Sequence, residues 1–410
     1  MIRKCFIVTS VSALAVTGLT GCTLFGTPES QESQTVTADE MTSENTQNAE
    51  ASTEASPKEE TSSAQNDSDK KQETEVSLLA VGDNLIHDTI YEAFYEGDGV
   101  YDFHSLYDYV RPTIKDYDIA VINQETIFVE DDDEVENYPN FGTPHEMGEA
   151  LVDTGFDVVL SATNHTMDKG ADTIEYMYDY WKTKYPQVSI LGIHGDEKDY
   201  NTIDYVEKNG IKLAMFNYTY GLNGYSLPDD RSYLVDLLDN KDKFISDLKK
   251  AEDEADMSVC FLHIGEEYTY EPTEFQKQYI EDIIDAGADL VICAHPHVVE
   301  PFGEVTTAKG NKGVVYYSCG NFVSAQDEID RLLGGMASVT IKKTTEGDRS
   351  VTEVTDFDFI PVVMHYSDWS TAVYKLEDYT DDLAGNHWVY YYDDRLSVDN
   401  LWELWKDITG

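Results

Sequence analysis

Histidine, carboxylate and carboxamide side chains occur in a few short segments of this 410-residue chain, at spacings that suit metal binding. The most specific segment is His295-Pro296-His297. In a regular strand its two imidazoles would point to opposite faces, but the proline interrupts the strand and lets both rings face one site. Asp, Glu, Asn and His supply the oxygen and nitrogen ligands of zinc, manganese and iron. The other residues of these types that follow the expected strands are Asp83, His87, Asn123, Glu125, Asn164, His165, His263, Glu266 and Glu267.

Charge gives the physical reason to expect a metal. Two carboxylates about 4 Å apart repel by roughly 4 kcal/mol at an effective dielectric constant of about 20, and a divalent ion turns that repulsion into attraction. With two ions, Glu125 could bridge them, and a bound water would become a hydroxide nucleophile near neutral pH. We therefore expect divalent metal ions as cofactors, with Mn, Fe and Zn all compatible with these ligands.

Each of these segments also has an ordinary structural explanation. Asp83 follows a glycine and could cap a turn or a helix. His263 alone is more often a hydrogen-bonded structural histidine than a ligand, and for Asn321 a turn role is the simplest interpretation. The metal hypothesis depends on the joint pattern, because independent loops would not all place ligand-type residues after strands. The remaining candidates could equally be loop residues: Asn123, Glu125, Asn164 and His165.

Short apolar runs that are typical of buried strands precede most of these residues, and helical patterns lie between several of the runs. This alternation predicts an α/β domain, whose functional groups cluster at the carboxyl ends of the strands. Residues 336–343 and 351–360 predict an antiparallel pair. The expected strands cover residues 76–81, 119–122, 158–161, 189–191, 212–216, 258–262, 290–293 and 314–318. The expected helices cover residues 146–154, 171–182, 241–255 and 273–286.

Composition excludes some classes of partner. The chain has 28 Lys and Arg against 80 Asp and Glu, a net charge of −52, which argues against nucleic acid and against loose adsorption to anionic lipid. Hydrophobic residues make up 41% of the chain, enough for a core. The five cysteines have no paired spacing, so neither a zinc knuckle nor a disulfide framework is expected.

The N-terminus is typical of a targeting segment. Arg3 and Lys4 precede an uncharged stretch that ends in Leu19-Thr20-Gly21-Cys22, which looks like a bacterial lipobox. An ordinary signal peptide with a chance cysteine is the alternative. We expect residues 1–21 to be a lipoprotein signal peptide and Cys22 to be lipidated, so that the protein is extracytoplasmic and anchored to the bacterial cell membrane. Residues 22–75 are then a disordered acidic linker, 76–362 the main domain and 363–410 an extension packed on it.

Several motifs together resemble the capsule-synthesis CapA family, also called PgsA, of poly-γ-glutamate synthesis. The resemblance covers roughly residues 76–361. The family is similar to the calcineurin-like metallophosphatases, so the resemblance implies a four-layer α/β/β/α sandwich with a dinuclear metal site. The matching stretches are Val81-Gly-Asp83, Asn123-Gln-Glu125, Ala162-Thr-Asn-His165, Met167-Asp168, His263-Ile-Gly-Glu-Glu-Tyr268, Gly287-Ala-Asp-Leu-Val-Ile-Cys-Ala-His-Pro-His-Val298 and Ser318-Cys-Gly-Asn-Phe322.

The resemblance implies a role for each matched residue. His165 would lie near the substrate and donate a proton to a leaving group. Two departures from the wider superfamily weaken an inference of phosphatase activity: Leu85 stands where a histidine is usual, with His87 displaced, and Glu125 replaces a bridging aspartate. The first metal would be held by Asp83, Glu125 and His297, and the second by Glu125, Asn164, His263 and His295. The candidate substrate contacts are Asn123, Glu267 and Asn321.

Two functions follow. The favoured one is a membrane-anchored accessory protein for making, exporting or retaining poly-γ-glutamate or a related polymer, with the polymer or components of its synthase and exporter as partners. The alternative is a dinuclear metal-dependent hydrolase of phosphoesters or γ-glutamyl amides, with His165 as general acid. A structural domain with an inactive site is a third reading.

Overall fold

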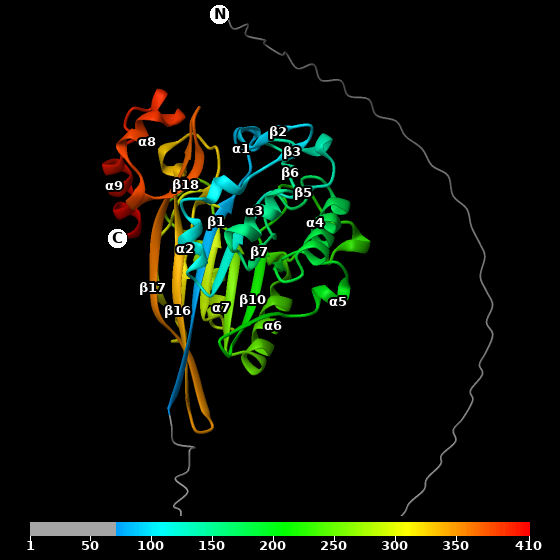
Figure 1. Ribbon diagram of the computed structural model, residues 1–410. Helices are drawn as coiled ribbons and strands as arrows, with labels where there is room; N and C mark the ends of the chain where they lie inside the picture. Colours follow the sequence, from blue (N-terminus) through cyan, green and yellow to red (C-terminus); the bar gives the residue numbers. More distant parts are fainter. Residues whose placement is uncertain (1–70) are drawn as a thin grey trace, which may run out of the picture. The chain divides into compact units, whose positions relative to one another are not determined.

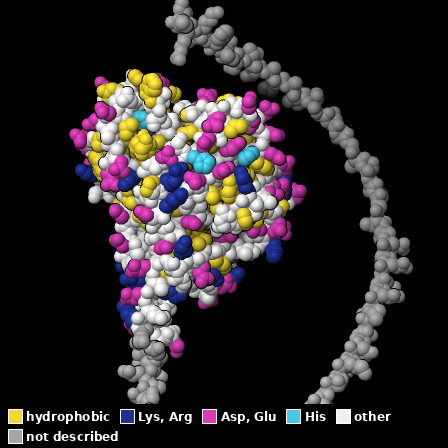
Figure 2. Space-filling view, viewed as in Figure 1, with side chains coloured by type: hydrophobic (Ala, Val, Ile, Leu, Met, Phe, Trp, Pro, Cys, Tyr) yellow, Lys and Arg dark blue, Asp and Glu magenta, His cyan; other side chains and the backbone are white. Residues whose placement is uncertain are grey.

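Two β-sheets face each other and position the candidate residues at one of their edges (Figure 1). The structure is a computed structural model that describes residues 71–410, and acidic side chains are spread over its visible surface (Figure 2). The predicted signal peptide, Cys22 and nearly all of the predicted linker lie outside the described residues. Within residues 71–410, no helix combines the length and apolar character needed to cross a bilayer.

The first sheet has eight strands and is mixed. Its parallel half contains the strands that end at or next to Asp83 and Asn123, and its antiparallel half is built on the predicted pair. β15 (Asn321–Val323) pairs with β1 beside the main path of the sheet. The strand order is β18 (Thr371–Lys375), β17 (Arg349–Tyr366), β16 (Leu333–Glu346), β1 (Gln72–Asn84), β4 (Ile119–Asn123), β7 (Val158–Leu160) and β8 (Ser189–Leu191).

The second sheet has six strands. Its central strands are parallel, and an antiparallel strand closes each edge. Side chains alternate between its two faces, so each face can be buried against a different layer. The order is β13 (Phe302–Thr306), β14 (Lys312–Tyr316), β12 (Leu290–Ala294), β11 (Met257–His263), β10 (Ile211–Thr219) and β9 (Asp204–Lys208).

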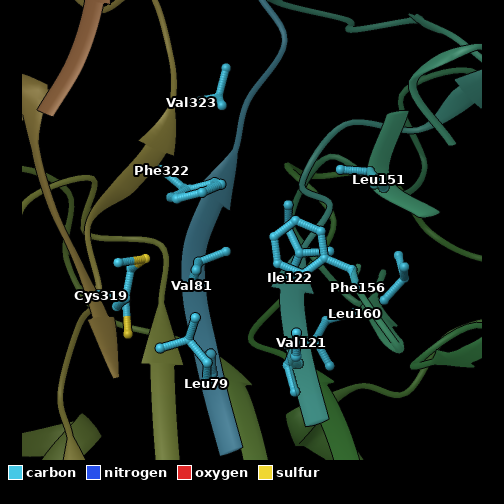
Figure 3. Packing of buried hydrophobic residues seen from close by; sticks show 14 of the residues in the cluster. Leu79, Val81, Val121, Ile122, Leu151, Phe156, Leu160, Cys319, Phe322 and Val323 are labelled. Atoms are coloured by element: carbon cyan, nitrogen blue, oxygen red, sulfur yellow. The ribbon is translucent and has the colours of Figure 1, made fainter. Parts of the chain in front are cut away.

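Two hydrophobic cores fill the space between the layers. On β11, Phe261 belongs to the core between the sheets, whereas Leu262 belongs to the core under the helices of the second sheet. That outer core includes Phe244 of α6 (Lys241–Glu254) and Ile280 of α7 (Glu274–Ile284). Figure 3 shows the apolar side chains that extend from β1 and β4 of the first sheet. The remaining helices are α1 (Asp88–Ala93), α2 (Arg111–Lys115), α3 (Met147–Thr154), α4 (Ala171–Lys184), α5 (Glu197–Tyr200), α8 (Asp381–Asn386) and α9 (Val398–Thr409).

The outer face of the first sheet is covered by α3 and α4, whose Leu151 and Trp181 are fully buried in the same core as β4. The molecule therefore has the predicted four-layer α/β/β/α arrangement. Short strands β2 (Tyr95–Gly97), β3 (Val100–Tyr101), β5 (Phe128–Val129) and β6 (Thr143–Pro144) form two small ribbons among the connecting loops.

Several strand boundaries differ from the predicted ones, and two of these differences affect the predicted limits of the main domain. β1 begins at Gln72 rather than residue 76, because polar residues there pair with the far end of β16 instead of entering a core. β17 continues to Tyr366, and β18 then completes the edge of the sheet, so the first residues of the predicted C-terminal extension belong to the sheet itself.

Candidate metal centre

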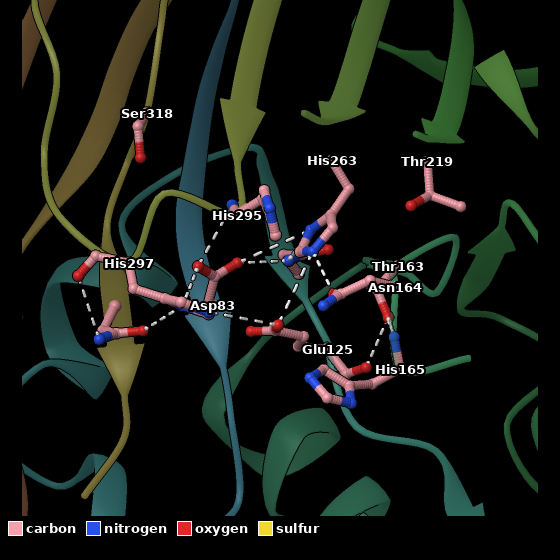
Figure 4. A network of polar contacts seen from close by, with 12 residues as sticks. Asp83, Glu125, Thr163, Asn164, His165, Thr219, His263, His295, His297 and Ser318 are labelled. Carbon is pink, nitrogen blue, oxygen red and sulfur yellow. Dashed lines mark hydrogen bonds and ion pairs between the residues drawn. The ribbon is translucent and has the colours of Figure 1, made fainter. Parts of the chain in front are cut away.

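The candidate ligands converge after the carboxyl ends of five strands, three from the first sheet and two from the second (Figure 4). Asn164 follows β7. Asp83 lies at the end of β1, and Glu125 follows β4. His263 ends β11 in the facing sheet, and His295 follows β12. Because parallel strands present their carboxyl ends at the same edge, groups far apart in sequence meet in one place.

Asp83 occupies the centre of the cluster and is fully buried. Its Oδ1 accepts a hydrogen bond of 2.7 Å from Nδ2 of Asn123, and its Oδ2 accepts one of 3.3 Å from the backbone N–H of His295. The same Oδ2 lies 3.1 Å from Nδ1 of His297. The Asp83 backbone N–H donates to the carbonyl of Gly320 at 3.0 Å, which fixes the end of β1 against β15.

The His-Pro-His loop turns both imidazoles toward this site through an unusual backbone. The backbone φ angle is 104° at His295 and 59° at His297, and residues other than glycine rarely adopt such positive values. The two ring centroids are 5.9 Å apart. Pro296 was expected to let both rings face one site, and the positive φ angles are the means by which the backbone does so.

Glu125 is the least satisfied group of the site. It is buried, and neither carboxylate oxygen has a hydrogen-bond partner among the described residues. Its Oε1 lies 3.7 Å from Nε2 of His263 and 3.8 Å from Nε2 of His297. Burial, and then the neighbouring charge of Asp83, raise the pKa of Glu125 well above its usual value. Such a carboxylate requires a compensating positive charge when it is ionised.

The histidines fall into two electrostatic classes. Burial lowers the pKa of His263 well below its usual value and that of His295 to about 3, so both rings are neutral and able to donate a lone pair. Burial also lowers the pKa of His297, but the carboxylates of Glu125 and Asp83 outweigh it and raise this pKa to about 9. Nδ1 of His295 is buried and has no hydrogen-bond partner in the described part of the chain.

These features fit a divalent cation. Ligand atoms of Asp83, Glu125 and His297 lie within 4.8 Å of one another, which is the set expected for a first ion. A second set within the same limit consists of Glu267, His295 and His297. Asn164, expected as a ligand with His263 and His295, has its Oδ1 2.8 Å from Nε2 of His263. The orphaned oxygens of Glu125 and the free Nδ1 of His295 are the groups that a cation would satisfy.

His165 lies beside the cluster, in a pair with Asp168. Its Nδ1 is 2.7 Å from Oδ2 of Asp168, which also accepts a 2.8 Å hydrogen bond from the backbone N–H of Phe141. The ring packs edge-on against Phe141 at 4.8 Å. An imidazole oriented by a buried carboxylate is suited to proton transfer.

A cavity of about 560 Å³ opens beside these groups. His165, Asn164 and His297 contribute to its wall, together with Glu267 and Tyr268 from the loop after β11. Glu267 is exposed and, among the described residues, is the one acid that lines the cavity. The cavity has room for a substrate group next to the candidate ligands.

The two other predicted substrate contacts are buried behind the ligands. Asn123 is 2% exposed and bonds to Asp83. Asn321 is fully buried, and its Oδ1 lies 3.1 Å from Nδ1 of His297 while its Nδ2 donates to the His297 carbonyl. These contacts suit a role in orienting ligands. His87 lines the cavity but belongs to neither ligand set, and burial lowers its pKa to about 4.

Asn223 was not predicted. Its Oδ1 accepts a 3.2 Å hydrogen bond from Asn164, and its Nδ2 lies 3.3 Å from Nδ1 of His165. It follows β10, which continues to Thr219, beyond the predicted strand end at residue 216. Had the strand been extended, the turn Gly221-Leu-Asn223-Gly224 would have been recognised as another loop at the same edge.

Comparison with known proteins places these residues in a family. The model of the family described as bacterial capsule synthesis protein PGA_cap matches residues 77–326, which contain Asp83 and His297. The PGA biosynthesis protein CapA of Bacillus subtilis (strain 168) is 28% identical over 253 residues, or 61% of this chain and 64% of that protein. The capsule biosynthesis protein CapA of Bacillus anthracis is 29% identical over 236 residues, 54% of each chain. The chain thus matches less than two thirds of the length of either relative.

Solved structures give weaker likenesses. A phosphatase from Mycoplasma pneumoniae aligns with a TM-score of 0.42 and 11% identity over 71% of this chain and 95% of that one. A NAD nucleotidase from Haemophilus influenzae aligns with a TM-score of 0.41 and 13% identity over 82% and 60%. The assignment therefore depends on the family model, which spans the strands and loops of the metal centre, and by it this chain belongs to the bacterial capsule synthesis protein family PGA_cap.

Proposed function

We propose that this protein is an extracytoplasmic, membrane-anchored component of capsule synthesis, and that its metal centre is the part that acts on the polymer or its carrier. The polymer we propose is poly-γ-glutamate or a related polyanion, and the action serves its synthesis, export or retention. Membership of the capsule synthesis family supports the process. The lipobox-like Leu19-Thr20-Gly21-Cys22 supports anchoring through a lipidated Cys22.

The single observation that carries the role of the metal is the unsatisfied carboxylate of Glu125. A buried, unpartnered carboxylate between two imidazoles and a second carboxylate is costly unless a cation compensates it. We propose two divalent ions, with manganese, iron and zinc as candidates. Asp83, Glu125 and His297 would hold the first. His263, His295, Asn164 and Glu267 offer the donors for the second.

Hydrolysis is the second candidate function, and the His165–Asp168 pair favours it. Bound divalent ions supply an activated water and polarise the bond to be cleaved. Asp168 orients the His165 ring, and His165 holds the proton that a leaving group needs. Substrates with a phosphoester or a γ-glutamyl amide fit this chemistry. Asn223 touches both His165 and Asn164 and links the proton donor to the ligands.

A cell-based experiment tests the capsule role and the part that the metal centre has in it. In a capsule-forming host, deletion of the gene is expected to lower the polymer at the cell surface, and the intact gene restores it. The Asp83→Ala/His297→Ala variant is expected not to restore the polymer. The control variant Glu274→Gln, at a side chain that is 94% exposed, is expected to restore it. Unchanged polymer after deletion would contradict a capsule role. Restoration by the double variant would contradict a role for the metal centre.

Anchoring has its own test. Cys22→Ser is expected to shift the protein from the membrane fraction to the culture medium, while Cys260→Ser, at a buried cysteine, leaves its fractionation unchanged. Retention of the Cys22→Ser protein in the membrane fraction would contradict lipidation as the anchor.

The hydrolase is tested with the purified, metal-loaded protein, assayed beside an active phosphatase. Cleavage of neither phosphoesters nor γ-glutamyl amides would rule out the hydrolase.

A further inference from the structure

A second cavity, of about 700 Å³, lies outside the metal centre and shares no lining residue with the cavity beside it. One wall comes from α1 and the segment 105–109. The opposite wall comes from residues 367–372 and Trp388, which lie beyond the part of the chain that the family model matches. Two residues that are neighbours in the sequence line different cavities: His87 lines the cavity beside the metal centre, and Asp88 lines this one.

Two tryptophans, Trp369 and Trp388, line this cavity. Within residues 71–410 the side chain of Trp369 is 88% exposed, whereas tryptophans are highly buried on average. The turn that carries it is closed by hydrogen bonds: Oγ of Ser367 accepts the backbone N–H groups of Trp369 and Ser370, and the Ser367 N–H donates to the Ser370 carbonyl. Trp388 is anchored by its Nε1, which donates to Asp368 at 3.1 Å. The hydrogen-bonded backbone of this turn therefore keeps the Trp369 side chain exposed.

The charge of the lining is of one sign. Four carboxylates contribute to it, and among residues 71–410 no Lys, Arg or His does. One of the four, Asp108, is paired with Arg111 at 2.6 Å. The other three have no salt-bridge partner within the described part of the chain: Asp88, Glu92 and Asp368. This lining repels a polyanion and attracts a cation.

We propose that this cavity binds a ligand carrying an ammonium group, which contacts the indoles of Trp369 and Trp388 while the carboxylates neutralise its charge. Aromatic rings bind ammonium groups through their faces, and nearby carboxylates strengthen the attraction. The charge complementarity excludes the capsule polyanion as occupant. The ammonium group is either a primary or a quaternary ammonium, and titration with cadaverine and with choline distinguishes these two ligand classes. The proposal does not depend on the metal centre.

The test is calorimetric titration of the intact protein with choline, with cadaverine, and with 3,3-dimethylbutan-1-ol, a neutral molecule of nearly the same shape as choline. We expect one site for choline or cadaverine, weakened by added salt, and no binding of the neutral alcohol. Choline without cadaverine identifies a quaternary ligand, and the reverse identifies a primary amine. Trp369→Ala is expected to weaken binding about fivefold.

Variants keep the result interpretable. Trp369 is exposed, so Trp369→Ala should fold normally, and Phe275→Ala, at a 62% exposed ring on α7, is the matched control that leaves binding unchanged. Glu92→Gln is expected to weaken cation binding without changing the fold. The proposal is overturned by equal binding of the neutral alcohol, by no binding of either cation, by unchanged binding in Trp369→Ala, or by binding of a neutral oligosaccharide alone.

Discussion

At the scale of single residues, the site depends on side chains that position the ligands as well as on the ligands. Asn321 is the clearest case, because it contacts both Nδ1 and the carbonyl of His297 and also donates to the carbonyl of Arg331. A histidine with positive φ and no such support would lose its orientation.

Asn321→Ala is therefore expected to weaken metal binding about tenfold while the protein stays folded. The measurement is a calorimetric titration with Mn²⁺ or Zn²⁺, alongside the melting temperature. Asn311→Ala, which removes an exposed amide that contacts Asp285, is the control and should bind metal normally. Wild-type affinity in Asn321→Ala would show that His297 holds its orientation without this contact.

Residue chemistry was also the part of the site most accessible from sequence. Asp83, His263 and the His-Pro-His segment lie together as the strand-end argument predicts. Two features were not accessible. The positive φ angles of His295 and His297 could not be read from the sequence, because no glycine marks these positions. The burial of Asn321 behind His297 depends on β15, a three-residue strand too short to show a periodic pattern.

At the scale of elements, the end of β1 depends on a close approach of two backbones. A Cβ built on Gly82 would lie 1.8 Å from the carbonyl oxygen of Gly320, beside the hydrogen bond that fixes Asp83. Only glycine permits this contact, so the junction of β1 and β15 sets the position of Asp83.

Gly82→Ala is expected to destabilise the protein by about 3 kcal/mol, because one of the two backbones must move. The measurement is the free energy of unfolding from chemical denaturation. Gly385→Ala, in α8 where nothing lies within 4 Å of the added methyl, should keep or slightly raise stability. Equal stability of Gly82→Ala and wild type would contradict the close approach.

The loop after β8 gives a prediction about pH. His194 is buried between Asp236, 2.8 Å from its Nε2, and Asp199, 3.2 Å from its Nδ1. Burial lowers the pKa of His194, but Asp236 and Asp199 outweigh it and raise this pKa to about 9. Because the folded pKa exceeds the unfolded value of about 6.5, the stabilisation is complete below that value and is lost as the pH rises through about 9.

His194→Gln should accordingly reduce the free energy of unfolding by about 3 kcal/mol at about pH 6 and by much less at about pH 10. Denaturation curves at several pH values give the measurement. His104→Gln, at an exposed histidine paired with Asp102, is the control and should have little effect at any pH. A cost of His194→Gln that is independent of pH would contradict the charged pair.

The elements themselves were predicted where their pattern is apolar. The buried runs of β4, β11 and β12 and the periodic helices α4 and α7 follow from spacing alone. The first residues of β1 are polar and form a strand only because β16 supplies a partner, so periodicity could not reveal them. The end of β10 was missed for a similar reason, since Asn217 and Thr219 are buried polar residues that interrupt its apolar run.

At the scale of the whole molecule, charge is distributed in a way that composition could not indicate. Acidic side chains are spread over the visible surface, yet Glu267 is the one acid that lines the cavity beside the metal centre. This distribution makes that cavity the place where the anionic polymer of the proposed function would be repelled least. The second cavity has the opposite character, with four carboxylates and two tryptophans.

The central claim is that the strand-end cluster binds a metal, and metal content measured by mass spectrometry tests it most directly. The purified chain, incubated with Mn²⁺, Fe²⁺ or Zn²⁺ and then desalted, is compared with Asp83→Ala/His297→Ala and with the exposed control Glu274→Gln. We predict one or two equivalents of metal in the wild type and the control, lost in the double variant. Metal-free wild-type protein, or equal metal in the double variant, would contradict the account.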